Sequence, residues 1–248
     1  MRRRYHSLVF SVAAVSALLI GNTSIAQGPP DRIVQRVLAA HGGRAAEAAE
    51  DSAGEGKLTL FGTDGPKAAF DVRLLRKGTT QVQRVIKQPA AEIRQGSDGT
   101  HTWESAGGFF TPAAQGHALH FIESQTVRSV HRLFRHPAEG LTLKDLGTKD
   151  KAGVIEAEDR QGRKTSYFID PDTERIARLE FVTGAGRDPL TGNSLTVTDA
   201  YVFSDYRMVQ GVLTPFKVER FNGTIKTEEM QFTTFTYGAG LKDQDFKR

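Results

Sequence analysis

The feature that most constrains this chain is a series of long extended runs joined by tight turns in residues 165–237. The runs span 166–169, 176–182, 194–207, 212–221 and 224–237. Asn222-Gly223 separates the last two, and Asn-Gly between strand-like runs is the strongest short hairpin signal. Pro171, between Asp170 and Asp172, presets φ for a turn that the aspartates can complete through local hydrogen bonds. These runs predict a meander of neighbouring antiparallel strands, long enough to curve.

The N-terminal half repeats this pattern. Strand-like runs lie at 54–63, 68–77, 81–88, 91–95 and 101–105, and two more follow at 141–146 and 153–158. Helical periodicity marks residues 30–49, with a stop at Gly42-Gly43, and residues 113–136, where His136-Pro137 should end the helix. Asp31 can cap the first helix. So few helices cannot cover both faces of a long sheet, so the sheet should curl around them. The pattern predicts a mainly antiparallel α+β fold of about eleven strands.

The N-terminus has the three regions of a secretory signal peptide. Arg2, Arg3 and Arg4 precede an apolar run of 13 residues at 8–20, and small residues follow up to Ala26. The run is shorter than the roughly 20 residues that a membrane-spanning helix needs. We therefore expect cleavage after Ala26, export to the periplasm, and a single domain over residues 27–248, because no long Pro/Ser/Gly linker divides it.

Charge and cysteine content exclude several classes of function. The three arginines of the predicted signal account for most of the formal net charge of +4, and the remaining charges alternate in sign without a basic cluster, so a nucleic-acid partner is not expected. The chain has no cysteine, which excludes a disulfide framework and a thiol nucleophile. Stability must therefore come from the core.

Motifs for catalysis or metal binding are weak. The sequence has no G-x-S-x-G, no phosphate-binding loop with its lysine and no general acid/base constellation. His117, His120, His131 and His136 fall within twenty residues, but H-E-x-x-H is absent and Glu123 is the one nearby acid before Glu139. We expect no catalytic residue, no metal and no cofactor.

Several turn and strand markers carry a resemblance. They are Ala39-x-His41-Gly42-Gly43 at the end of the first helix, Tyr167-x-Ile169-Asp170, Ile176-x-x-Leu179-x-Phe181, and the run F-S-D-Y-R-x-V-x-G-V-x-x-P-F at Phe203 to Phe216. In these the chain resembles the LolA-like envelope proteins and their outer-membrane-lipoprotein-sorting relatives. The resemblance implies a curved, incomplete barrel with helices on the concave side. It also implies a lipid or lipidated protein as partner, with an envelope membrane protein as a further candidate.

Aromatic and aliphatic residues in or near the second helix and the strands are candidates for a hydrophobic cavity. They are Trp103, Phe109, Phe110, Phe121, Leu133, Phe134, Phe203, Phe216 and Phe232. The segment 107–116 could form a mobile lid, in which case changing Phe109 and Phe110 to Ser should reduce lipid binding more than stability. The sequence therefore favours a non-enzymatic carrier of a lipid, lipoprotein or other hydrophobic ligand. The alternative is a regulatory or scaffold protein that binds another protein's extended segment, for example by strand addition at an open edge.

Overall fold

A single antiparallel sheet of thirteen strands dominates the computed structural model, which describes residues 29–113, 116–187 and 194–248. Helices α1 (Pro30–Ala40) and α2 (Arg44–Ala48) come first. The first six strands are β1 (Asp51–Gly62), β2 (Gly65–Lys77), β3 (Gln81–Lys87), β4 (Glu92–Asp98), β5 (Thr102–Ala106) and β6 (Phe109–Pro112). The last seven are β7 (Thr142–Lys149), β8 (Ala152–Glu158), β9 (Lys164–Ile169), β10 (Ile176–Arg187), β11 (Ser194–Val209), β12 (Val212–Asn222) and β13 (Ile225–Tyr237). The predicted signal peptide, residues 1–26, lies outside the described residues.

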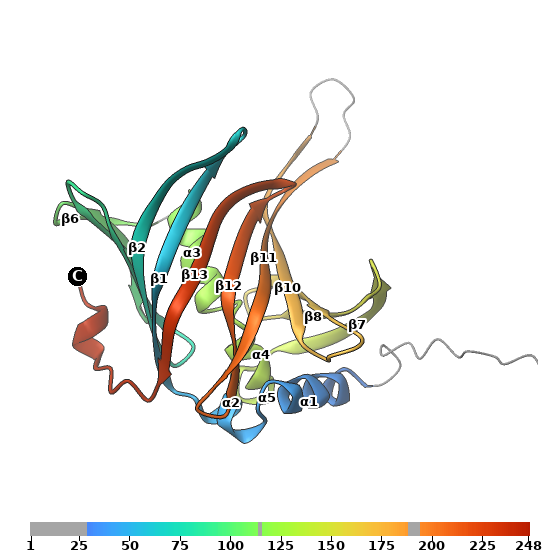
Figure 1. Cartoon of the computed structure of the whole chain (residues 1–248). Coiled ribbons are helices and arrows are strands. Elements are labelled where there is room, and N and C mark those ends of the chain that lie inside the picture. The colour runs from blue at the N-terminus through green and yellow to red at the C-terminus, as the bar shows by residue number, and fades with distance from the viewer. Residues whose placement is uncertain (1–28, 114–115, 188–193) are drawn as a thin grey trace, which may run out of the picture.

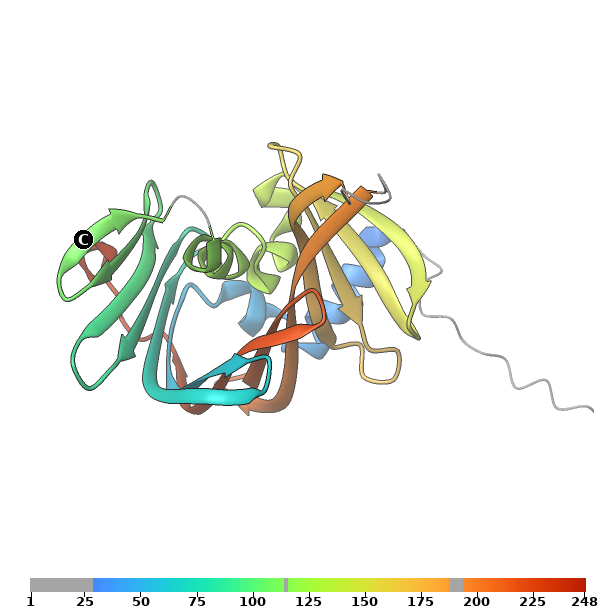
Figure 2. The ribbon, with the colours of Figure 1, turned by 90° about the horizontal axis from the view of Figure 1, so that it is seen from above.

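The order of the strands makes the sheet open. It runs β6-β5-β4-β3-β2-β1-β13-β12-β11-β10-β9-β8-β7, so two meanders join where β1 pairs with β13. Strands β6 and β7 end the sheet at opposite sides, and the chain between them crosses the concave face (Figure 1). Seen from above, the sheet curves around this helical connection (Figure 2). The predicted curved, incomplete half-barrel is confirmed, with thirteen strands in place of about eleven.

The connection is three short helices, where the sequence predicted one helix at 113–136. These are α3 (Gly116–Gln125), α4 (Val130–Phe134) and α5 (His136–Glu139). The hydroxyl of Thr126 donates to the carbonyl of Ile122 at 2.7 Å as α3 ends. Ser129 then caps α4, because its Oγ accepts a hydrogen bond from the amide of Arg132 at 3.2 Å. Pro137 lies in the first turn of α5 and so begins a helix where it was expected to end one.

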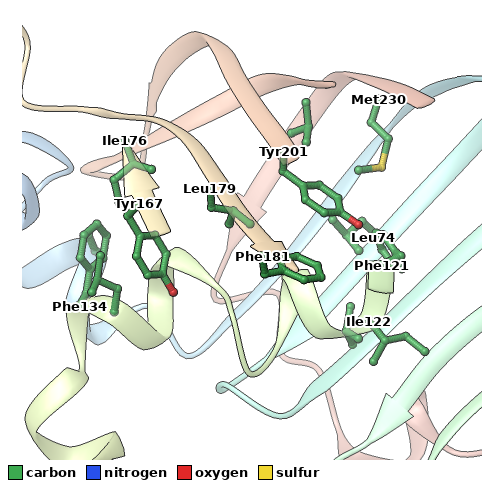
Figure 3. Packing of buried hydrophobic residues seen from close by; sticks show 14 of the residues in the cluster. Leu74, Phe121, Ile122, Phe134, Tyr167, Ile176, Leu179, Phe181, Tyr201 and Met230 are labelled. Atoms are coloured by element: carbon green, nitrogen blue, oxygen red, sulfur yellow. The ribbon is translucent and has the colours of Figure 1, made fainter. Parts of the chain in front are cut away.

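The core lies between the concave face and the helices. Helix α1 buries Ile33, Val34, Val37 and Leu38, which recur at helical spacing. Asp31 does not cap this helix but accepts a hydrogen bond from Nε2 of His136 at 2.8 Å, which ties α1 to α5. Figure 3 shows side chains of β9, β10 and β11 meeting those of α3 and α4. Each large apolar side chain buried there stabilises the fold by about 1.5–3 kcal/mol.

A bulge between β1 and β13 accommodates aromatic rings on the concave face. The register shifts between Glu55 and Gly56, and Gly54 and Gly56 face Phe235 and Phe232. A Cβ on Gly54 would lie 2.8 Å from the ring of Phe235. The two glycines therefore let the rings lie directly on the backbone of β1 at the bulge.

The convex face is covered in part by the C-terminal segment. Its 3-10 helix η1 (Asp243–Phe246) packs on β3 and β4, and Phe246 is fully buried. Nε2 of Gln83 donates to the carbonyl of Asp245 at 2.9 Å. Because successive side chains of a strand point to opposite faces, Gln83 marks the convex face of β3 and its neighbour Arg84 the concave face.

Candidate functional site

His41 joins four elements at one end of the concave face. It follows α1, and its carbonyl accepts the amide of Leu213 at 3.0 Å. Nε2 accepts the amide of Ile176 at 3.1 Å, so this nitrogen carries no proton and the ring is neutral. The ring also lies 5.3 Å from that of Phe134 and 5.5 Å from that of Tyr206, between centroids. Burial disfavours the charged ring and lowers the pKa of His41 to about 4.

The marker residues of the sequence meet around this histidine. Gly42, next to His41, approaches the hairpin between β11 and β12 so closely that a Cβ would lie 2.1 Å from the carbonyl oxygen of Gly211. Gly42 also has φ of 113°, a conformation that favours glycine. The hydroxyl of Tyr206 donates to the carbonyl of Ile176 at 2.5 Å. Residues that are far apart in the sequence therefore form one packed junction.

A cavity of about 120 Å³ opens beside this junction, between the concave face and helices α2 and α4. Its wall is mostly apolar. The described residues that line it come from α2 and the residue after it (Ala46, Ala49), from α3, α4 and their connection (Ser124, Gln125, Ser129, Val130, His131, Phe134), and from the strands (Ser52, Leu74, Arg76, Leu179, Phe203, Tyr206, Val212, Leu213, Thr214, Pro215, Phe232, Phe235, Tyr237), with His41 at one end. A concave, aromatic-rich cavity with few polar groups is the usual form of a small-molecule site.

Polar contacts hold the helical side of this cavity in place. Arg128, between α3 and α4, donates from Nη1 to the carbonyl of Lys164 at 2.7 Å and lies over the ring of Phe181 at 4.3 Å. The hydroxyl of Tyr167 donates to the carbonyl of Arg128 at 3.0 Å. Arg132 of α4 pairs with Glu139 at 3.1 Å. Both ends of α4 are thus tied to fixed parts of the molecule.

Helix α3 rests on two buried ion pairs further along the concave face. Arg220 donates from Nε to Asp199 at 3.0 Å, and Arg84 donates from Nη1 to Glu228 at 2.8 Å. Both arginines and Asp199 are almost completely buried. Burial alone would raise the pKa of Glu228, but Arg84 and Arg220 outweigh it and lower this pKa. The two acids compensate the two arginines, so this cluster has no obvious unpaired charge for a ligand.

The same cluster contacts α3 directly. Nη1 of Arg220 donates to the carbonyl of His117 at 3.1 Å. The guanidinium of Arg84 lies over the ring of Phe121 at 3.8 Å, a cation–π geometry. Nδ1 of His120 lies 3.4 Å from Asp199. These contacts hold α3 over the sheet. His117 and His120 therefore belong to this polar cluster, whereas His131 lines the cavity.

Three of the predicted cavity residues lie together at this cavity: Phe134, Phe203 and Phe232. Three others are buried on the same side of the sheet but line other parts of the core. These are Phe121 under α3, Leu133 of α4, and Phe216, whose ring lies 6.5 Å from that of Phe235. These six candidate residues therefore lie on the concave side of the sheet, and three of them line the cavity.

Trp103 and Phe110 point to the convex face. Trp103 is directly opposite Gly96 and is therefore on the same face as Gln83, the residue that binds the C-terminal segment. The rings of Trp103 and Phe110 are 5.4 Å apart. Phe109 is 83% exposed at the tip of the sheet. Residues 109–112, which the sequence assigned to a lid, form the terminal strand β6. None of these three residues is part of the cavity wall.

The sequence analysis missed several cavity residues. Tyr206 was interpreted only as part of a marker run, His41 only as part of the first helix and of the marker at its end, and Arg76 was not singled out. The one available signal was the alternation of β2, because Leu74 and Arg76 share a face with each other. The alternation alone does not show whether Leu74 and Arg76 lie on the concave or the convex face, because that depends on where the helices pack.

Comparison with solved structures identifies the fold. The chain resembles a DUF1329 family protein from Desulfovibrio piger with a TM-score of 0.58, 12% identity, and coverage of 90% of this chain and 98% of that one. It also resembles a LolA superfamily protein from Nitrosomonas europaea with a TM-score of 0.54, 12% identity, and coverage of 89% and 98%. The protein has a LolA-like fold. Neither a family model nor a curated protein matches the sequence.

The helices are all too short or too polar to cross a bilayer, as far as the described residues extend.

Proposed function

We propose that the protein is a non-enzymatic periplasmic carrier that binds a hydrophobic ligand, a lipid or an acyl chain, in the cavity beside His41. The observation that carries the proposal is the apolar wall itself, built from Phe134, Phe203, Phe232 and Phe235 under a short helix. An acyl chain gains about 0.8 kcal/mol for each methylene that it removes from water there. The predicted signal peptide and the LolA-like fold support the periplasmic location, with one domain at 27–248.

Binding of a neutral apolar probe tests this proposal. N-phenyl-1-naphthylamine becomes fluorescent in an apolar site, and the wild-type protein should bind it saturably. Ala49→Phe would place a ring in the cavity and should weaken binding at least tenfold. Ala69→Phe makes the same change at an exposed position of β2 and serves as the matched control. Absence of saturable binding, or equal binding by both variants, would contradict the proposal.

Native mass spectrometry of protein purified gently from an envelope extract would detect a ligand that remains bound. A bound lipid or acylated peptide should appear as a discrete added mass that Ala49→Phe reduces and Ala69→Phe retains. Organic extraction of the same sample then gives its chemical class.

A second candidate function is supported by the end of the sheet at β6, one of its two edge strands. Strand β6 has one partner strand, and both Phe109 and Phe110 are exposed there. A regulatory or scaffold protein could bind another protein's extended segment at such an edge. The edge is short, and Pro112 lacks an amide donor, so it offers few hydrogen bonds. Changing Phe109 and Phe110 to Ser should abolish a lipid-free protein complex under this function and leave probe binding in the cavity unchanged.

A further inference from the structure

The cavity beside His41 contains a positive charge without a compensating acid. None of the described residues that line it is Asp or Glu. Arg76 contributes a guanidinium to the wall, and within the described parts of the chain it has no hydrogen-bonding or ion-pair partner. A partly buried charge without a partner is unfavourable, and arginine is the side chain best suited to carboxylates and phosphates.

The groups near Arg76 add to this excess of positive charge. Arg76 lies on β2 opposite Ser52 of β1, which pairs on its other side with Tyr237 of β13. Burial, first, and the nearby guanidinium of Arg135 lower the pKa of Arg76, whereas Tyr237 acts in the opposite direction. No carboxylate contributes to that shift. An anion in the cavity would therefore meet the guanidinium of Arg76 and no acid of the described wall, while Arg135 acts only from outside the wall.

His131 provides a second polar group without a partner. It is 4% exposed and lines the cavity, and its Nε2 atom has no hydrogen-bonding partner among the described residues. Burial, first, and then the nearby Arg76 and Arg135 lower the pKa of His131 to about 3, against the opposing effect of the Ala46 backbone. Buried polar atoms are almost always hydrogen-bonded in native proteins, so Nε2 of His131 is a polar group in the cavity wall that is available to a ligand.

We infer that the cavity takes a single-chain amphiphile whose anionic head group, a carboxylate or a phosphate, pairs with Arg76 while its chain lies along the aromatic wall. This rests on the proposed function and adds the chemical class of the ligand. A volume of about 120 Å³ is below the roughly 300–1,000 Å³ of most ligand pockets, which favours one chain over two or three. The apolar wall holds the chain, and Arg76 sets its direction.

The test compares three ligands with the same twelve-carbon chain. Dodecanoate, dodecyl phosphate and dodecanol differ in head group only, and each is titrated by displacement of N-phenyl-1-naphthylamine from the full mature chain. The wild-type protein should bind at least one of the two anions about 10- to 100-fold more tightly than the alcohol, the range expected for a charge-assisted hydrogen bond. The tighter anion distinguishes a carboxylate from a phosphate source.

Variants assign the effect to Arg76. Arg76→Gln should bring the ratio of anion affinity to dodecanol affinity close to one, whereas Arg76→Lys, which keeps the charge, should retain most of the wild-type ratio. Arg73→Gln is the matched control, because Arg73 is on the same strand and exposed on the opposite face, where it pairs with Glu55. It should bind all three ligands as the wild type does.

The outcomes separate the two proposals. Equal affinity of the wild type for all three ligands, or a preference that survives in Arg76→Gln, would overturn the head-group inference and leave hydrophobic binding standing. Failure of all three ligands and of the probe to bind would overturn the proposed function and the inference together. If Arg76→Gln does not fold, the affinities of the wild type and of Arg76→Lys for the three ligands still test whether the anionic head group is preferred.

Discussion

Replacing Asp199 by Asn should destabilise the protein strongly, because Asp199 neutralises a buried guanidinium under α3. Asp199 is fully buried and accepts hydrogen bonds from Nε of Arg220 at 3.0 Å and from Nδ2 of Asn222 at 2.8 Å. An Asn side chain of the same shape removes the charge. Arg220 then keeps the carbonyl of His117 and a carboxylate oxygen of Glu228 at 3.8 Å.

The expected loss follows from the burial of both partners. Removing one partner of a buried ion pair costs about 3–5 kcal/mol, because the other charge stays in the interior without compensation. Arg220 is 1% exposed, so solvent screening gives little relief. A loss of this size lowers the melting temperature of a domain of this length by roughly 6–20 °C, at about 2–4 °C per kcal/mol. It is a large part of the 5–15 kcal/mol by which most proteins are stable.

Urea unfolding followed by the fluorescence of Trp103, the one tryptophan and a fully buried one, measures this loss directly. Asp205→Asn is the matched control on the same strand, since Asp205 pairs with Arg207 at the surface and Asn tolerates its φ of 51°. A double variant, Asp199→Asn with Arg220→Met, should regain most of the stability because it removes both charges. Equal midpoints for Asp199→Asn and Asp205→Asn would refute the reasoning.

Three further predictions concern other parts of the molecule. Histidines of the unfolded chain take up a proton near pH 6.5, whereas His41 and His131 in the folded protein stay neutral down to about pH 4 and 3. The free energy of unfolding, measured in urea, should therefore be highest above pH 6.5 and should fall toward pH 4 by up to about 1.4 kcal/mol per pH unit for each histidine. Equal unfolding midpoints at pH 7 and pH 5 would contradict this. Gly56→Ala would place a Cβ 2.1 Å from a backbone oxygen of β13 and should cost at least about 1–3 kcal/mol in thermal unfolding, whereas Gly153→Ala, with 4.0 Å of space, should be tolerated. Phe246→Ala should cost about 3–5 kcal/mol without weakening probe binding, because Phe246 covers the convex face; a parallel loss of binding would count against that separation.

The turns and the strand content could be predicted from local sequence. Asp170 accepts the amides of Asp172 and Thr173 as the turn residues indicated, and Gly211 and Gly223 have positive φ at the predicted hairpin turns. Asp205 and Arg207, two residues apart on β11, form an ion pair at 2.7 Å. Such features depend on a few neighbouring residues, so they can be predicted without knowledge of the rest of the chain.

The helix at 113–136 shows the limit of periodicity. Of the apolar residues that gave the periodicity, Ile122, Leu133 and Phe134 are buried, whereas Leu119, Val127 and Val130 are half-buried. The chain nevertheless breaks between α3 and α4, since Ser129 makes a better cap than a helix-interior residue. Tertiary contacts of Arg128 then hold the break in place.

The class of structure follows from the sequence pattern: a long antiparallel meander with too few helices to cover it must form a curved open sheet around a helical connection. The face that each aromatic residue occupies depends instead on the three-dimensional packing. Trp103 and Phe232 each stand between two polar residues in the sequence, yet Trp103 lies on the convex face and Phe232 lines the cavity. The physical reason is the period of two along a strand, in which a shift of one residue exchanges the faces. Likewise, the pairing of Arg220 with Asp199 and the isolation of Arg76 depend on which distant strands the sheet brings together.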